Sequence, residues 1–172
     1  MISGLIIVSV RSEYANQMKE ELIMASRFEE YSQDENLFLT NLAEALGHPG
    51  EIARSGMVLR NVLHTLRDHI TVSESLKMIS QLPVFLKALY VDNWTFTEKP
   101  MRIKNRKEFT TEVEKHEATY GERVLDWKES TEEMVMIVIR ELESHISKGE
   151  DDGFLAQMPE DLKKLFREIT HA

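Results

Sequence analysis

The feature that most constrains the fold of this chain is an internal repeat with an offset of 76 residues. Residues 55–90 align with residues 131–166 without a gap, and 10 of the 36 aligned pairs are identical. The identical pairs are Val62/Val138, Leu66/Leu142, His69/His145, Ile70/Ile146, Glu74/Glu150, Gln81/Gln157, Pro83/Pro159, Leu86/Leu162, Lys87/Lys163 and Leu89/Leu165. A chance alignment of this length gives about two identities, so we interpret the chain as two copies of one unit.

The spacing of apolar residues predicts that each copy is helical. In copy one these residues lie three, four or seven apart, at Ile52, Leu59, Val62, Leu63, Leu66 and Ile70. Such spacing places them on one face of a helix of about 20 residues. Thr71 and Glu74 then form a capping box that starts a second helix. Pro83 ends that helix and leads into a third, from Val84 to about Asp92.

A further helix precedes these three in each copy. In copy one it follows a predicted N-cap at Asp34, carries Phe38 and Leu42, and ends at Gly47. Its counterpart in copy two opens with Asn105 and Glu108 and carries Phe109 and Val113.

The apolar run at 134–139 could by itself be a buried strand. Its counterpart in copy one has helical spacing, so we predict a helix over residues 131–147, buried on most of its circumference.

The predicted fold class is all-α: two tandem repeats of about four helices each, packed as one helical domain, plus an N-terminal helix. The boundaries are 1–30 for the N-terminal extension, 31–94 for copy one, 95–107 for a basic linker and 108–172 for copy two. Residues 12–31 carry an apolar helical stripe, formed by Tyr14, Met18, Leu22, Ala25 and Phe28. Residues 1–11 have no repeat partner, so we expect them to be poorly packed.

The repeated residues resemble a known family. The matching segments are Phe38/Leu42, Val62 to Ile70 and Gln81 to Leu89, then Phe109/Val113, Val138 to Ile146 and Gln157 to Leu165. They resemble the bacterial family catalogued as domain of unknown function 2267, over about residues 30–170. The resemblance implies a helical protein that carries the unit twice, and it implies no catalytic residues. His69 and His145 depart from the Arg that the resemblance leads us to expect.

Compartment and chemistry are constrained by what the sequence lacks. The apolar start of the chain is shorter than the roughly 20 residues that span a bilayer, and no secretion signal accompanies it. We therefore expect a cytoplasmic protein with no membrane partner. The absence of Cys excludes disulfides, thiolate metal sites and a Cys nucleophile. The chain also contains no Gly-rich phosphate loop and no nucleophile elbow.

Charge is distributed unevenly along the chain. Residues 1–94 sum to −4, residues 95–107 to +4 and residues 108–172 to −9. The basic linker is the candidate anion-binding segment, with five cations at Lys99, Arg102, Lys104, Arg106 and Lys107. It could bind RNA or another phosphate-bearing ligand. We favour an intramolecular clasp against the acidic second copy instead, and nucleic acid is therefore an unlikely partner.

Histidines raise the question of a metal site. If the copies pack about a two-fold axis, His69 and His145 could converge with Glu141 as a third ligand. We favour the simpler interpretation that both are cations at helix C-termini. His64, Asp68 and His69 are interpreted as part of a solvated face. We therefore predict no catalytic residue, no metal and no cofactor.

The copies differ where a partner could bind. Leu76, Val84 and Phe85 of copy one align with Asp152, Glu160 and Asp161 of copy two. This apolar face must be covered, either by residues 12–31 or by a partner, and we favour the covering helix. The candidate partner-binding residues are Leu76, Val84, Phe85 and Trp94.

The predicted function is a non-enzymatic helical interaction or regulatory module with an unknown protein partner or a homo-oligomeric contact. An enzyme with an unrecognised carboxylate or histidine site is the alternative, and a nucleic-acid binder comes third.

Overall fold

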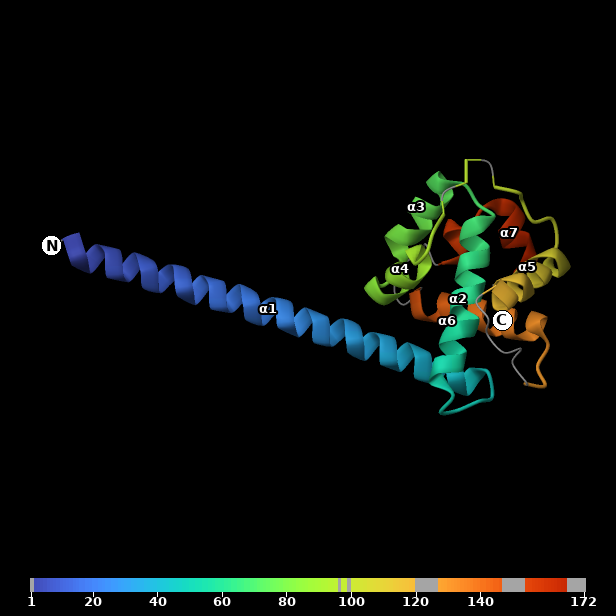
Figure 1. Cartoon of the computed structure of the whole chain (residues 1–172), viewed down its shortest axis with the longest axis horizontal. Coiled ribbons are helices and arrows are strands. Elements are labelled where there is room, and N and C mark those ends of the chain that lie inside the picture. The colour runs from blue at the N-terminus through green and yellow to red at the C-terminus, as the bar shows by residue number, and fades with distance from the viewer. Residues whose placement is uncertain (1, 96, 99, 120–126, 147–153, 167–172) are drawn as a thin grey trace. The chain divides into compact units, whose positions relative to one another are not determined.

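The structure is a computed structural model that describes the backbone of residues 2–95, 97–98, 100–119, 127–146 and 154–166. Within these residues every regular element is a helix, which confirms the predicted all-α class (Figure 1). The elements are α1 (Ile2–Ala45), α2 (Ile52–Asp68), α3 (Val72–Gln81), α4 (Val84–Val91), α5 (Arg106–Thr119), α6 (Thr131–Ile146), the 3-10 helix η1 (Leu155–Gln157) and α7 (Glu160–Leu165).

The chain divides into two compact units. Unit 1 is Met1–Asn36 and unit 2 is Leu37–Ala172, so α1 contributes to both. The predicted N-cap at Asp34 is wrong, because α1 continues through this residue as one helix. The physical reason is that no Gly or Pro occurs between Gly4 and Gly47, so the polar residues around Asp34 lie on an exposed helix face without interrupting it.

The predicted helix ends are confirmed where the sequence carries a capping signal. Gly47 follows α1 with a φ of 81°, a conformation that favours glycine, and the His48 N–H donates to the Ala43 carbonyl at 2.9 Å. Thr71 and Glu74 form the predicted capping box at the start of α3. At the start of α5, the Glu108 N–H donates to Asn105 Oδ1 at 2.9 Å.

One core in unit 2 includes residues from helices on both sides of the basic linker. Helix α2 lies at its centre and packs against α4, α5 and α6 (Figure 1). Leu59 and Leu66 of α2 are fully buried, in one cluster with Phe109 of α5 and Val138 of α6. The predicted packing into one helical domain is therefore confirmed, whereas the division of this domain into two copies stays a prediction.

Helix α6 confirms one prediction and corrects another. The apolar run at 134–139 is helical, as predicted. However, α6 is not buried on most of its circumference, since its buried residues are Met134, Val135, Val138, Ile139 and Leu142. Met136 and Ile137 are half-buried and Arg140 is exposed. The side chains predicted to be buried on most of the helix circumference therefore form one inner face and one accessible face.

Two predictions concern residues outside the described part of the chain. The packing of residues 1–11 depends on side chains that are not described, because side-chain description begins at Tyr14. The helix-for-helix correspondence of the copies depends partly on residues 147–153, which also lie outside the described residues. That correspondence stays a prediction.

Candidate interaction surfaces

The basic linker binds within the chain through Arg102. Its guanidinium bridges two helices: Nη2 lies 3.0 Å from Glu74 Oε1 of α3, and Nη1 lies 3.3 Å from Asp161 Oδ2 of α7. Burial acts to raise the pKa of Glu74, but hydrogen bonds from Thr71 and Arg102 outweigh it and leave this pKa lowered. Glu74 therefore stays ionised, and Arg102 joins α3 to α7.

Arg106 fixes the end of the same linker. Its Nε and Nη2 donate to the Leu165 carbonyl at 3.0 and 2.8 Å, at the last turn of α7. Its Nη1 lies 3.4 Å from Glu132 Oε1 of α6. The side chains of Lys104 and Lys107 are exposed, and Lys99 lies outside the described residues. The expected clasp is thus formed by two of the five linker cations, and anion binding by the set stays a prediction.

The candidate partner-binding residues of copy one divide into two pairs. Leu76 is 59% exposed and Val84 is 45% exposed. Phe85 is half-buried, with its ring 5.6 Å from that of Phe38, and Trp94 is half-buried against Arg67. The first pair forms an accessible apolar surface on α3 and α4, whereas the second pair contributes to packing.

Three acidic residues of copy two align with the apolar residues Leu76, Val84 and Phe85, and their exposure was predicted from that alignment. Glu160 is exposed, and Asp161 is partly exposed where it contacts Arg102. Asp152 lies outside the described residues. Glu160 and Asp161 thus lie outside the core, as an unpaired charge must.

Sequence analysis missed a buried arginine. Arg67 of α2 is only 2% exposed, and its Nη1 donates to the carbonyls of Tyr90 and Asp92, both at 2.8 Å. The Tyr90 hydroxyl in turn donates to Ser75 Oγ at 2.9 Å, and burial raises the pKa of Tyr90 to about 12. Arg67 thus binds the C-terminus of α4 to α2. No local sequence pattern reveals it, because its acceptors are backbone atoms more than 20 residues away.

The interpretation of His64 and Asp68 as a solvated face was wrong. His64 lies on α2 and is fully buried, with its Nε2 2.9 Å from the Leu89 carbonyl. Desolvation lowers the pKa of His64 to about 4. Asp68 accepts from Arg67 Nε at 2.8 Å and lies 3.3 Å from His116 Nε2. Burial tends to raise the pKa of Asp68, but these two partners lower it overall.

This cluster borders a small hollow. The hollow beside Arg67 and Asp68 has a volume of about 10 Å³, the space of roughly one water molecule. The side chains bind one another and the backbone, so their arrangement supports the α2–α4–α5 packing.

His69 and His145 have different surroundings. The His69 Nδ1 contacts the Met101 carbonyl, and its Nε2 lies 3.8 Å from Glu112. The His145 ring packs against Phe38, with 4.9 Å between ring centroids. Among the described residues, no group of three metal-binding side chains gathers.

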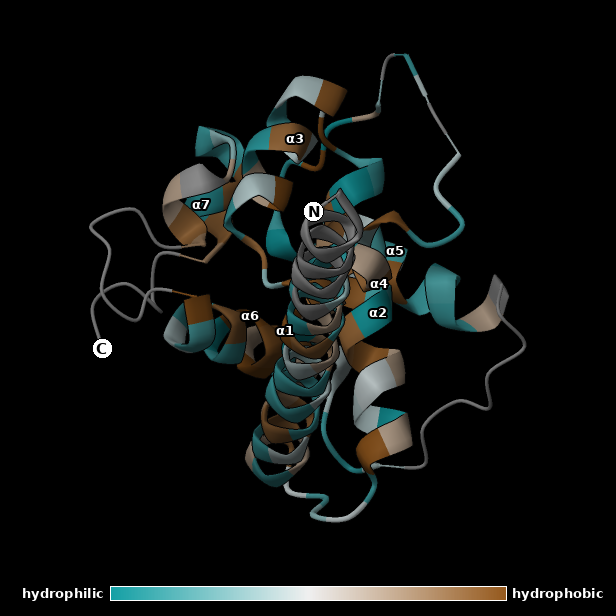
Figure 2. Ribbon diagram, turned by 90° about the vertical axis from the view of Figure 1, so that its left-hand side faces the viewer, coloured by the Kyte–Doolittle hydropathy of each residue, from teal (hydrophilic) through white to brown (hydrophobic). Residues whose placement is uncertain are grey.

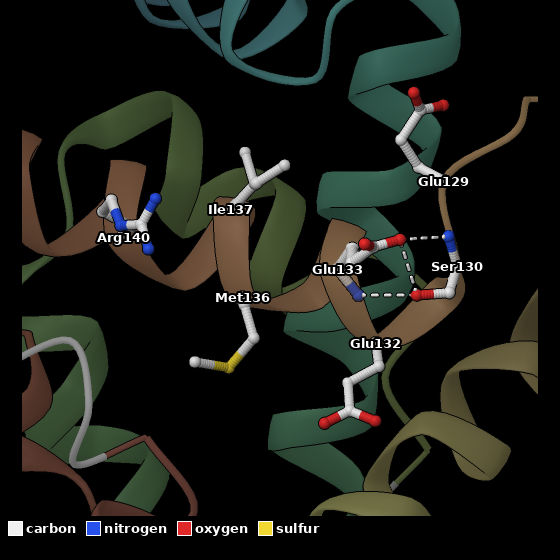
Figure 3. Close-up of a pocket in the computed structure, with 7 residues that line it drawn as sticks. All are labelled: Glu129, Ser130, Glu132, Glu133, Met136, Ile137 and Arg140. Atoms are coloured by element: carbon white, nitrogen blue, oxygen red, sulfur yellow. Dashed lines mark hydrogen bonds between the residues drawn. The ribbon is translucent and has the colours of Figure 1, made fainter.

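The outer face of α6 forms an open hollow of about 480 Å³ that sequence analysis also missed. Met136 and Ile137 supply its apolar part, Arg140 lies toward one end, and carboxylates lie toward the other (Figure 3). Glu133 belongs to the capping box of α6, in which its carboxylate accepts a hydrogen bond from the Ser130 N–H at 2.8 Å. The remaining lining residues are Glu129, which binds His48 at 3.0 Å, and Glu132, which binds Arg106.

Unit 1 carries seven exposed large apolar side chains between Tyr14 and Tyr31. We call Tyr14, Met18, Leu22, Ala25 and Phe28 the N-terminal stripe. Its four large side chains are 65–73% exposed. Met24 and Tyr31 extend it and are also exposed. Figure 2 shows such hydrophobic residues interspersed with hydrophilic ones along α1. Sequence analysis identified this stripe as a helix face in need of a partner.

Comparison with known proteins identifies the family of residues 35–168. A family described as "Uncharacterized conserved protein (DUF2267)" matches residues 35–168. The match covers unit 2 except its last residues, and it begins after the N-terminal stripe. No curated protein matches the chain. Among the described residues, no helix is both long and apolar enough to cross a membrane.

Proposed function

Since the chain belongs to the DUF2267 family, whose description specifies no activity, we propose a function from the surfaces of the molecule itself: a helical protein-interaction module that binds through the N-terminal stripe. The observation that carries this proposal is the exposure of four large apolar side chains on one helix face within 15 residues. Exposed apolar surface of this extent is typical of protein–protein contact sites. The stripe lies outside the matched residues 35–168, so it adds a binding element to the family domain.

The polar clusters support binding over catalysis. The ionisable groups of the α2–α5 cluster bind each other at 2.8–3.3 Å, and the adjacent hollow has the volume of about one water. The linker cations Arg102 and Arg106 bind carboxylates and a backbone carbonyl of the same chain. A nucleic-acid ligand would have to displace these contacts, so truncating Arg102, Lys104 and Arg106 together is expected to leave RNA affinity unchanged.

The proposal includes a second, smaller surface and a cellular setting. Leu76 and Val84 are exposed on α3 and α4 and could extend the contact area. The family resemblance supports a bacterial, cytoplasmic protein with two tandem copies of the unit. The ten repeat identities support the same duplication.

Photo-crosslinking tests the proposal in cells that express the full chain. A benzophenone amino acid at Phe28 is expected to form covalent adducts with protein, identified by mass spectrometry. The matched control carries the same probe at Ile23, which is 45% exposed on the opposite side of α1 and should yield few adducts. Equal yields at the two positions, or none at Phe28, would contradict an interaction through the stripe.

A further inference from the structure

We infer that the partner of the N-terminal stripe is the same stripe of a second copy of this chain, with the two helices antiparallel. This inference rests on the proposed function, because it names the partner of that surface. The first argument is spacing. Tyr14, Glu21 and Phe28 recur every seven residues, with Met18 and Ala25 four residues after the first two. Alternating steps of four and three residues are typical of the seam of a coiled coil.

The second argument is the placement of charge. Over residues 14–31 the positions that flank the seam include Gln17, Leu22, Met24 and Tyr31, which carry no charge. Only Glu21 and Glu29 bring carboxylates to this half of the helix, and the other charged residues project from the far half. A partner chosen by charge would need charged flanks to bind, whereas a face that is apolar apart from these two carboxylates can bind a second copy of itself.

The third argument sets the orientation. A parallel pair in register would place Glu21 opposite its own copy, where two carboxylates would repel each other. An antiparallel pair that places Met18 opposite Phe28 instead sets Glu21 opposite Ala25. The small Ala25 side chain leaves the carboxylate a path to water, and Gln17 Nε2 already donates to Glu21 Oε1 at 3.1 Å. In the antiparallel arrangement the two Glu21 residues are displaced from each other by about 6 Å along the helix axis, so this arrangement is favoured over the parallel one.

Sedimentation equilibrium of the full chain tests the self-association. The wild-type chain is expected to be a dimer at high micromolar concentration and to dissociate on dilution. Met18→Glu should raise the dissociation constant at least tenfold, because it places a charge in the seam. Ile23→Glu adds the same charge on the opposite side of the helix, so it should change the constant less than twofold. A wild-type chain that stays monomeric, or two variants with equal effects, would overturn the inference.

Disulfide trapping tests the orientation, and the absence of Cys from the chain makes it unambiguous. In the antiparallel register, Tyr14 of one copy lies beside Ser32 of the other, while the two Tyr14 residues are about 27 Å apart. Mixed Tyr14→Cys and Ser32→Cys chains should form the mixed disulfide under mild oxidation, and neither variant alone should cross-link. Cross-linking of Tyr14→Cys with itself would overturn the antiparallel pairing.

Failure of this inference can be told from failure of the proposed function. A monomeric chain whose Phe28 probe still cross-links to a different protein would overturn the second copy as partner but leave the interaction function standing.

Discussion

Units 1 and 2 use the same helix in opposite ways. Phe28 in unit 1 is 65% exposed, whereas Phe38, ten residues later in unit 2, is 2% exposed. Phe38 packs with Phe85 and His145, so it helps to hold the two copies together. Phe28 contacts only Tyr31 of its own helix among the described aromatic rings. Unit 2 therefore folds around its apolar residues, whereas the large apolar residues of the N-terminal stripe are exposed.

The largest expected effect tests this comparison on matched residues. Phe38→Ala should lower the free energy of unfolding by about 3–5 kcal/mol, because it empties part of the core. Phe28→Ala should change it by less than about 0.5 kcal/mol at dilute, submicromolar concentration. Urea denaturation followed by circular dichroism measures both. A large loss from Phe28→Ala under these conditions would mean that unit 1 is part of the folded core.

The next effect concerns arginines in the two units. Arg67→Ala should destabilise unit 2 by about 3 kcal/mol, because it leaves the buried carbonyls of Tyr90 and Asp92 without a donor. Arg67→Lys should recover part of the loss. Arg27→Ala in unit 1 is the control and should have little effect, since Arg27 is exposed. If Arg67→Ala proved as mild as Arg27→Ala, the buried arginine would not hold α4 to α2.

The pH dependence of unfolding tests whether the buried His64 of unit 2 is neutral in the folded state. The folded-state pKa of His64 is lowered from 6.5 to about 4, so the unfolded chain binds a proton at pH values where the folded chain does not. Stability is therefore full above pH 6.5 and falls as the pH drops toward 4. Between pH 7 and pH 5, His64 should account for about 1.5 kcal/mol of this loss.

His64→Gln isolates that contribution from the carboxylates that titrate in the same range. The variant is expected to lose less stability than the wild type between pH 7 and pH 5, measured by urea midpoints. Parallel pH profiles for the two proteins would show that His64 is not held neutral in the folded state.

The smallest effect concerns the linker of unit 2. Arg102→Ala should cost about 0.5–1 kcal/mol at low salt, since its bridge to Glu74 and Asp161 is partly exposed. The cost should diminish in 1 M salt, which screens the charges. Lys104→Ala is the matched control and should be neutral at either salt concentration. A cost for Arg102→Ala that did not respond to salt would point to packing of its alkyl chain.

Much of this architecture is predictable from local pattern, and the exceptions have physical causes. Thr71, Glu74 and Gly47 act on backbone atoms a few residues away, so their roles can be recognised in the sequence. Asp34 misled the analysis because a good N-cap residue does not end a helix that contains no Gly or Pro. Arg67 and His64 bind backbone carbonyls 23–25 residues away, and spacing along one helix cannot reveal such partners.

Among the surfaces, the N-terminal stripe was predictable because its apolar spacing is visible in the sequence. The hollow on α6 was not. The six consecutive apolar residues at 134–139 predict burial on most of the helix circumference, but Met136 and Ile137 lie on a face that the described helices leave accessible.

Hydrogen exchange of the wild-type chain as a function of its concentration tests the central claim most directly. A helix without a packing partner is marginally stable, so the amides of residues 14–31 should exchange fast in dilute solution. The account predicts that their exchange slows at least tenfold as the concentration rises from submicromolar to high micromolar, while that of α2 stays constant. Exchange at 14–31 that is equally slow at every concentration would contradict the account and indicate a stripe already covered within its own chain.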